Sequence, residues 1–234
     1  MLDLVNGTER VPGALLLPPG APVPAVLLLH GFSSNKERMS HSVGRALQQR
    51  GVASLALDLP FHGERDGGRD AIPYRNPLAL VAAWTTAVRE ARAAIEWLAA
   101  QPEIDGERMA VIGYSLGGFL ALMTASEEPR VRAVALAAAG DLPDSTPYAA
   151  LVRRAVDPLR AVRKLHGRPL LLVNGRRDTT TRPAQAERLF AYAEEPKRLS
   201  WYDGGHWPPP AAIDEAAEWM ARELGAVGAT RQAG

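Results

Sequence analysis

A serine flanked by glycines, between two apolar stretches, is the feature of this sequence best suited to chemistry. The segment AVIGYSLGGFLAL, residues 110–122, places Ser115 between Gly113 and Gly117 in a G-x-S-x-G pattern, and Gly118 follows directly. A strand that turns sharply into a helix strains the residue at the turn, and glycines on either side remove side-chain collisions. Either the turn merely contains a serine or it presents the hydroxyl. The strand and helix patterns on its two sides favour a presented nucleophile.

A serine hydroxyl is a weak nucleophile and needs a base, which in turn needs an orienting carboxylate. At turns of this kind the three groups follow in the chain order serine, acid, histidine. Asp178 ends the segment NGRRD, His206 ends the segment GGH, and each segment follows a strand candidate. Taken alone, Asp178 also fits a helix cap and His206 a surface turn, and Asp141 is the alternative acid. Their joint placement predicts Ser115, Asp178 and His206 as the catalytic residues.

Attack of this serine on a carbonyl group creates a negative oxygen that needs hydrogen-bond donors. The backbone N–H of Leu116, the residue after the serine, is the expected first donor. The segment His30-Gly31-Phe32 ends the first long apolar run, and the N–H of Phe32 is the expected second donor. For His30 itself we expect a structural role.

The segment PFHGER, residues 60–65, follows another apolar run and leaves two alternatives open. His62 either lines the substrate pocket or, together with Arg65, ties the loop down by hydrogen bonds. His41 and His166 lie in polar surroundings and are assigned no role. The five histidines show no spacing typical of metal ligands, so we expect no metal.

These segments belong to a chain in which short aliphatic runs alternate with amphipathic stretches, such as those at 78–100 and about 211–224. Such alternation predicts an open, mostly parallel α/β sheet with helices on both faces. Ligands bind beyond the carboxyl ends of the strands in these sheets, which is where the candidate residues fall. The Pro- and Gly-rich segment 11–24 predicts one or two antiparallel edge strands joined by a turn. The clearest strand candidates are 25–30, 52–58, 109–113, 131–137, 169–174 and 198–203.

The motifs carry a resemblance to a known family when they are taken together. The sequence resembles the α/β-hydrolases across nearly its whole length, and most of all the compact, dienelactone-hydrolase-like branch that includes small bacterial serine esterases. This resemblance implies an eight-stranded sheet, hydrolysis through a covalent acyl-enzyme, and no cofactor. Dienelactone hydrolase itself uses a cysteine, which this chain lacks, so ordinary esters are the expected substrates. The segments that carry the resemblance are HGF at 30–32, LDLPFHGER at 57–65, GYSLGG at 113–118, NGRRD at 174–178 and GGH at 204–206.

Composition argues against several other classes of protein. A chain of 234 residues fits one domain, 1–234, and its net charge of +1 provides no basic surface for nucleic acid or an anionic membrane. The absence of cysteine excludes disulfides and thiolate metal sites. The first residues, MLDLVNGTER, lack the pattern of a secretory signal. We therefore expect a cytoplasmic protein, a monomer or homodimer, whose partner is a small-molecule ester.

The connection between the runs at 131–137 and 169–174 bears on the size of the substrate. Residues 138–168 must include a crossover helix, and helical patterns at 148–152 and 156–165 leave room for only a small cap. We therefore expect a serine hydrolase for short- to medium-chain carboxylic esters. Two alternatives stay open: the same residues acting on a thioester, an amide or a short peptide, and a non-enzymatic ligand-binding protein of the same fold.

Overall fold

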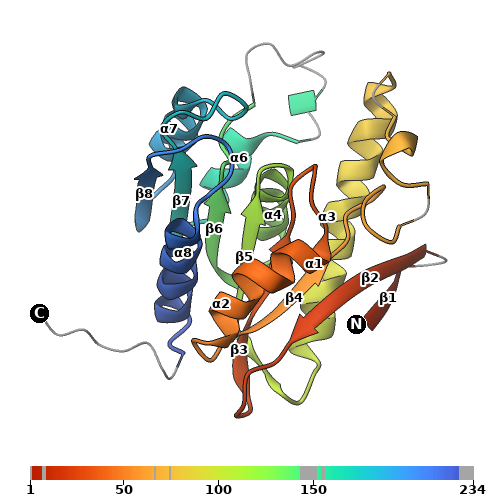
Figure 1. Ribbon diagram of the computed structural model, residues 1–234, viewed down its shortest axis with the longest axis vertical. Coiled ribbons are helices and arrows are strands. Elements are labelled where there is room, and N and C mark those ends of the chain that lie inside the picture. Colours follow the sequence, from red (N-terminus) through yellow and green to blue (C-terminus); the bar gives the residue numbers. More distant parts are fainter. Residues whose placement is uncertain are drawn as a thin grey trace, which may run out of the picture.

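The computed structural model describes residues 2–6, 9–65, 67–73, 75–142, 152–153 and 156–226 (Figure 1). Within these residues the strands form an eight-stranded sheet in the order β1-β2-β4-β3-β5-β6-β7-β8. Only β2 runs against its neighbours, because it pairs antiparallel with β1 and β4, and the ladders from β4 to β8 are all parallel. The expected eight-stranded, mostly parallel sheet is therefore confirmed. The strands are β1 (Leu2–Asn6), β2 (Glu9–Leu16), β3 (Val23–Leu29), β4 (Ala53–Leu57), β5 (Ile104–Tyr114), β6 (Val131–Ala137), β7 (Leu170–Gly175) and β8 (Lys197–Tyr202).

Each of the six strand candidates coincides with one strand of the sheet, and the differences lie at the sheet's first edge and in β5. The Pro- and Gly-rich segment supplies a single antiparallel strand, β2, whose hairpin partner β1 precedes that segment. Strand β5 begins at Ile104 rather than Met109. Its first residue pairs with Val23, and the ladder then shifts before Ala25 pairs with Met109. The polar residues 105–108 lie in this irregular stretch, so no apolar pattern marks them as a strand.

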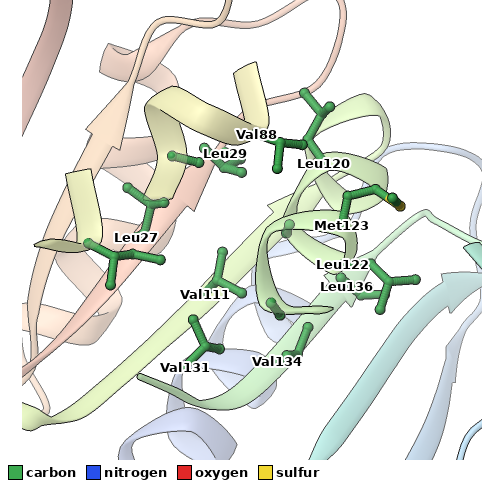
Figure 2. Close-up of a cluster of buried hydrophobic side chains, with 14 of the residues drawn as sticks. Leu27, Leu29, Val88, Val111, Leu120, Leu122, Met123, Val131, Val134 and Leu136 are labelled. Carbon is green, nitrogen blue, oxygen red and sulfur yellow. The ribbon is translucent and has the colours of Figure 1, made fainter. Parts of the chain in front are cut away.

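Helices cover both faces of the sheet, which explains why the central strands are almost continuously apolar. In β3, Leu27 and Leu29 point into one hydrophobic core, and Val26 and Leu28 point into a second core on the opposite face. Figure 2 shows part of the first core, in which leucines of β3 meet side chains of α3, α4, β5 and β6. The helices on the first face are α3 (Pro77–Ala99), α4 (Leu116–Glu127), α6 (Pro158–Arg163) and α7 (Pro183–Tyr192).

The second face carries α8 (Pro210–Glu223) and one continuous helical segment, in front of the sheet in Figure 1. That segment consists of α1 (Lys36–Met39), a π-helical turn η1 (Ser40–Gly44) and α2 (Arg45–Gln48). A Cβ atom at Gly44 would lie 2.9 Å from the Ser54 hydroxyl oxygen and 3.2 Å from a Leu16 methyl carbon. Glycine at this position therefore lets the segment pack closely on β4 and β2.

Local signals start the helices where the sequence patterns place them. The side chain of Asn76 caps α3 by accepting a hydrogen bond from the N–H of Ala79, and Pro77 occupies the first helical position. Asp157 caps α6 in the same way, with Pro158 as its first residue. The helical pattern at 156–165 is thereby confirmed as α6. Residues 148–151 of the other pattern lie outside the described residues.

Candidate functional site

Ser115 lies at the carboxyl end of β5, in the sharp turn that begins α4. Its φ of 53° and ψ of −115° place a non-glycine residue in a rarely populated backbone conformation. A Cβ atom at Gly113 would collide with the carbonyl oxygen of Gly117, and one at Gly117 would collide with that of Leu29. The glycines are thus required because the helix start lies directly against β5 and the end of β3. The strained strand-to-helix turn expected from the sequence is confirmed.

The three residues singled out in the sequence meet at the carboxyl edge of the sheet. His206 Nε2 lies 2.9 Å from Ser115 Oγ, and His206 Nδ1 lies 2.8 Å from Asp178 Oδ2. The Asp178 side chain is fully buried, and that of His206 is 18% exposed. A continuous chain of hydrogen bonds therefore runs from a buried carboxylate through an imidazole to a hydroxyl group.

Asp178 is held in place by the loop that follows β7. Its Oδ1 accepts hydrogen bonds from the N–H groups of Thr180 (2.8 Å) and Thr181 (3.0 Å), which leaves Oδ2 for the histidine. The Arg177 N–H donates to the Gly204 carbonyl at 2.9 Å and so joins this loop to the one after β8. The acid and the histidine are thus fixed relative to each other by backbone contacts as well as by their own bond.

Two tyrosines support the histidine loop. The Tyr202 hydroxyl donates to the carbonyl oxygens of Gly205 (3.0 Å) and His206 (3.3 Å), and the Tyr114 hydroxyl lies 3.4 Å from the latter. The Tyr114 ring also packs against the His206 ring, with 5.4 Å between the centroids. Burial, and then the nearby charge of Asp178, raise the pKa of Tyr202 to about 12. Neither tyrosine was predicted from the sequence to have a role, although Tyr114 directly precedes the serine.

Asp141, the alternative acid, serves another purpose. Its carboxylate accepts a two-pronged interaction from the Arg153 guanidinium at 2.9 and 3.0 Å, and Arg188 lies 3.4 Å away. This ion cluster joins the loop after β6 to the segment before α6 and to α7. Since the His206 ring is hydrogen-bonded to Asp178, the geometry favours Asp178 as the orienting carboxylate.

The expected oxyanion donors, Phe32 and Leu116, line the same cavity. Leu116 is the first residue of α4. Its N–H therefore has no carbonyl one turn earlier in the helix to bond with. Phe32 follows Gly31, where a Cβ atom would lie 2.6 Å from the Tyr114 ring, so the loop after β3 approaches β5 closely. The Ser34 N–H donates to the Gly31 carbonyl at 3.0 Å and tightens this loop. The donor role of the two N–H groups stays a prediction.

An ion cluster around a buried lysine fixes the loop after β4. The fully buried Lys36 ammonium contacts Asp58 and Glu64 at 2.9 Å each and Glu37 at 2.6 Å. Burial opposes its charge, but the hydrogen bonds to the three carboxylates outweigh that effect and raise the pKa of Lys36. A Cβ atom at Gly63 would collide with the Asp58 carboxylate, so the glycine lets the loop close over it. Asp58 belongs to the quoted segment LDLPFHGER, but no role was predicted from the sequence for Asp58 or for Lys36.

The structure shows the expected hydrogen bonds of His62 and Arg65 and also places His62 in the lining of a cavity. His62 Nδ1 lies 2.8 Å from the Pro60 carbonyl oxygen, and Arg65 forms a two-pronged pair with Glu90 at 2.9 Å, so both residues tie the loop down. The His62 ring also lines the cavity beside Phe32. His30 is structural, as expected: its Nδ1 is bonded to the Gly31 carbonyl and its Nε2 accepts from the Leu59 N–H.

No group of three or more histidine or carboxylate side chains among the described residues is arranged to hold a metal ion. No helix in the same part of the chain is both long and apolar enough to cross a membrane.

The sheet topology and the strained serine turn are those of the alpha/beta hydrolase fold, and the model of that family matches residues 24–162. The chain belongs to the α/β-hydrolase family.

Among curated relatives, the chain is similar to the esterase YjfP of Escherichia coli, with 28% identity in an alignment 237 positions long, which covers 87% of this chain and 90% of YjfP. It is also 33% identical, over 119 residues and 51% of its length, to the polyketide transferase ATR5 of Stachybotrys chlorohalonatus. The chain spans only 37% of the length of ATR5. Among solved structures, TT1662 from Thermus thermophilus superposes with a TM-score of 0.79 at 24% identity, covering 97% of this chain and 98% of TT1662, which shows the shared fold.

Proposed function

We propose that this protein is a serine hydrolase that cleaves short- to medium-chain carboxylic esters. The observation that carries the proposal is the chain of hydrogen bonds from Asp178 through His206 to Ser115 at the carboxyl edge of the sheet. Membership of the α/β-hydrolase family supports the same class of reaction, and so does the name of YjfP, an esterase.

In the proposed reaction, His206 Nε2 takes the hydroxyl proton of Ser115 while Oγ attacks the carbonyl carbon of the ester. Asp178 accepts the Nδ1–H hydrogen bond and thereby fixes the tautomer whose Nε2 can act as a base. His206 then returns the proton to the leaving alcohol, and the acyl group remains on Ser115. Water attacks this acyl-enzyme by the same steps, which releases the acid and restores the serine.

The N–H groups of Phe32 and Leu116 are the proposed donors to the negative oxygen of the tetrahedral intermediate. Two features support this assignment. The backbone N–H groups of the first turn of α4 have no acceptor within the helix, and the helix dipole places partial positive charge at the same end. Both residues also line one cavity, and Leu116 directly follows Ser115 in the chain.

The size of that cavity supports short to medium acyl groups. Its volume is about 200 Å³, and it is lined mainly by apolar side chains of α3, the loop after β4 and the start of α4. A dry cavity of about 150 Å³ accommodates a benzene molecule, which has six carbons. The cavity therefore accommodates roughly six to eight carbons in a compact arrangement, and longer chains must extend into solvent.

Hydrolysis of p-nitrophenyl butyrate by the wild-type protein and a Ser115→Ala variant tests the proposal. We expect the variant to lose at least about 10³-fold in kcat, because the attacking oxygen is missing. Ser126→Ala is the matched control on the same helix, since its hydroxyl bonds only to a local backbone carbonyl. We expect it to retain wild-type kcat. Full activity of Ser115→Ala would contradict the proposal.

The two alternatives predict different results in the same assay. A preference for a butyryl thioester or a butyryl anilide over the oxygen ester would keep the proposed residues and change the substrate class. Binding of an ester without turnover of any acyl compound would indicate a non-enzymatic protein. The intact hydrogen-bond chain at Ser115 disfavours this last case, because a binding protein has no use for an aligned base.

A further inference from the structure

The cavity lined by Phe32 and Leu116 contains two side chains with polar atoms for which the proposed reaction has no use. Among the described residues that line it, only His62 and Trp84 carry a nitrogen in the side chain. The lining is otherwise aliphatic or aromatic and includes Phe32, Phe61 and Leu120. A polar atom in such surroundings needs a hydrogen-bond partner, because burial without one is unfavourable.

The hydrogen bonds of the loop determine which nitrogen of His62 carries the proton. Nδ1 lies 2.8 Å from the carbonyl oxygen of Pro60, and because a carbonyl can only accept, Nδ1 is the donor. In the neutral imidazole, Nε2 is then an acceptor with a free lone pair. His62 as a whole is only 3% exposed, and its Nε2 is buried. This nitrogen has no hydrogen-bond partner among the described residues.

The neighbouring histidine cannot satisfy it. The ring of His30 lies 5.1 Å from that of His62, but both of its nitrogens are bonded to the backbone of Gly31 and Leu59. The ring of Phe32, on the other side, lies 5.4 Å away in an edge-on arrangement and offers only carbon. The acceptor therefore has no partner from the described residues, and it belongs to a ring that lines the cavity.

The position of the cavity indicates which half of an ester enters it. The carbonyl oxygen of a bound ester would face the N–H groups of Phe32 and Leu116, whose side chains line this cavity. The leaving alcohol must face His206, and no residue of the described loop 203–208 contributes to the lining. The cavity therefore belongs to the acyl half.

Building on the proposed function, we infer that His62 Nε2 accepts a hydrogen bond from a hydroxyl group on the acyl part, so that esters of compact hydroxy acids are the preferred substrates. The aromatic side chains of Phe32, Phe61 and Trp84 also suit a flat ring. The acyl group of a hydroxyphenyl acid fits the volume of the cavity and its apolar lining, and its hydroxyl group supplies the donor for His62 Nε2.

A matched pair of substrates tests this inference: the p-nitrophenyl esters of 4-hydroxyphenylacetic acid and 4-methylphenylacetic acid. The two acyl groups have nearly the same shape and differ in the hydrogen-bond donor. We expect the wild-type protein to favour the hydroxyl ester in kcat/KM by about tenfold, the effect of one hydrogen bond of ordinary strength. A ratio of one or less in the wild-type protein would overturn the inference, because Nε2 would then be satisfied by solvent.

Two variants test whether His62 Nε2 causes the preference for the hydroxyl ester. In His62→Phe, which keeps a ring but has no acceptor, we expect the ratio to fall to one or below. Trp84→Phe is the matched control, because it removes the other nitrogen of the lining, which is a donor, and we expect the ratio to persist whatever happens to the absolute rates. A ratio that survives in His62→Phe would also overturn the inference.

These outcomes are separable from failure of the proposed function. If the wild-type protein cleaves both esters at equal rates, the inference fails and the esterase proposal stands. If it cleaves neither these esters nor p-nitrophenyl butyrate, the esterase proposal itself fails.

Discussion

Burial of His30 makes the stability of this protein depend on pH between about 6.5 and 4. The ring is fully buried, with both nitrogens bonded to the backbone as a neutral imidazole requires. Burial lowers the pKa of His30 from 6.5 to about 4. Below pH 6.5 the unfolded chain binds a proton that the folded protein does not, so the free energy of unfolding decreases until the pH reaches about 4. The difference of about 2.5 pH units corresponds to about 3 kcal/mol.

Urea unfolding of the wild-type protein and of His30→Gln at pH 7.5, 6, 5 and 4.5 measures this effect. Glutamine can donate and accept hydrogen bonds but does not titrate, and groups such as Glu64 titrate in both proteins and so cancel in the difference. At pH 7.5 we expect the wild-type protein to have the larger free energy of unfolding. Below pH 6.5 this difference from His30→Gln should shrink by up to about 1.4 kcal/mol per pH unit. A difference that stays constant with pH would refute the buried, neutral state of His30.

Three further predictions concern the acid, the loop after β4 and the acyl chain. In steady-state assays Asp178→Asn should lower kcat about 10⁴-fold, because it favours the wrong histidine tautomer, whereas Asp141→Asn should retain most of it; the opposite ranking would move the acid to Asp141. Urea unfolding of Lys36→Met should show a loss of about 3–5 kcal/mol, because Asp58 stays buried without its cation. Arg132→Met, which breaks an exposed pair with Glu107, should cost less than about 1 kcal/mol, and equal losses would contradict the difference in burial. Across p-nitrophenyl esters of two to sixteen carbons, kcat/KM should peak near four to six carbons and fall before twelve; a maximum at sixteen would contradict the small cavity.

The sequence was sufficient to predict the sheet and the candidate residues because both depend on local signals. Strands β3, β4, β6 and β7 and the second half of β5 are short aliphatic runs. Ser115 and Asp178 follow such runs, and His206 follows the mixed strand β8. Parallel strands have their carboxyl ends at one edge of the sheet. The positions of the three residues after such strands were therefore enough to predict that they lie close together.

Contacts between distant segments could not be predicted in this way. Lys36 and Asp58 are 22 positions apart, and nothing in either local sequence shows that they form a buried ion pair. The hydroxyls of Tyr114 and Tyr202 hold the histidine loop through backbone carbonyls, which carry no sequence signal. The start of β5 was missed because residues 105–108 are polar and lie in a shifted ladder.

Mass spectrometry of the protein after reaction with a p-nitrophenyl alkylphosphonate tests the central proposal most directly. The reagent transfers its phosphonyl group to an activated serine and releases p-nitrophenol. We expect one adduct per chain, on the peptide that contains Ser115, with loss of ester hydrolysis in proportion to labelling, and no adduct in Ser115→Ala. An adduct on another residue, or full hydrolysis by protein labelled at Ser115, would contradict the assignment of Ser115 as the nucleophile.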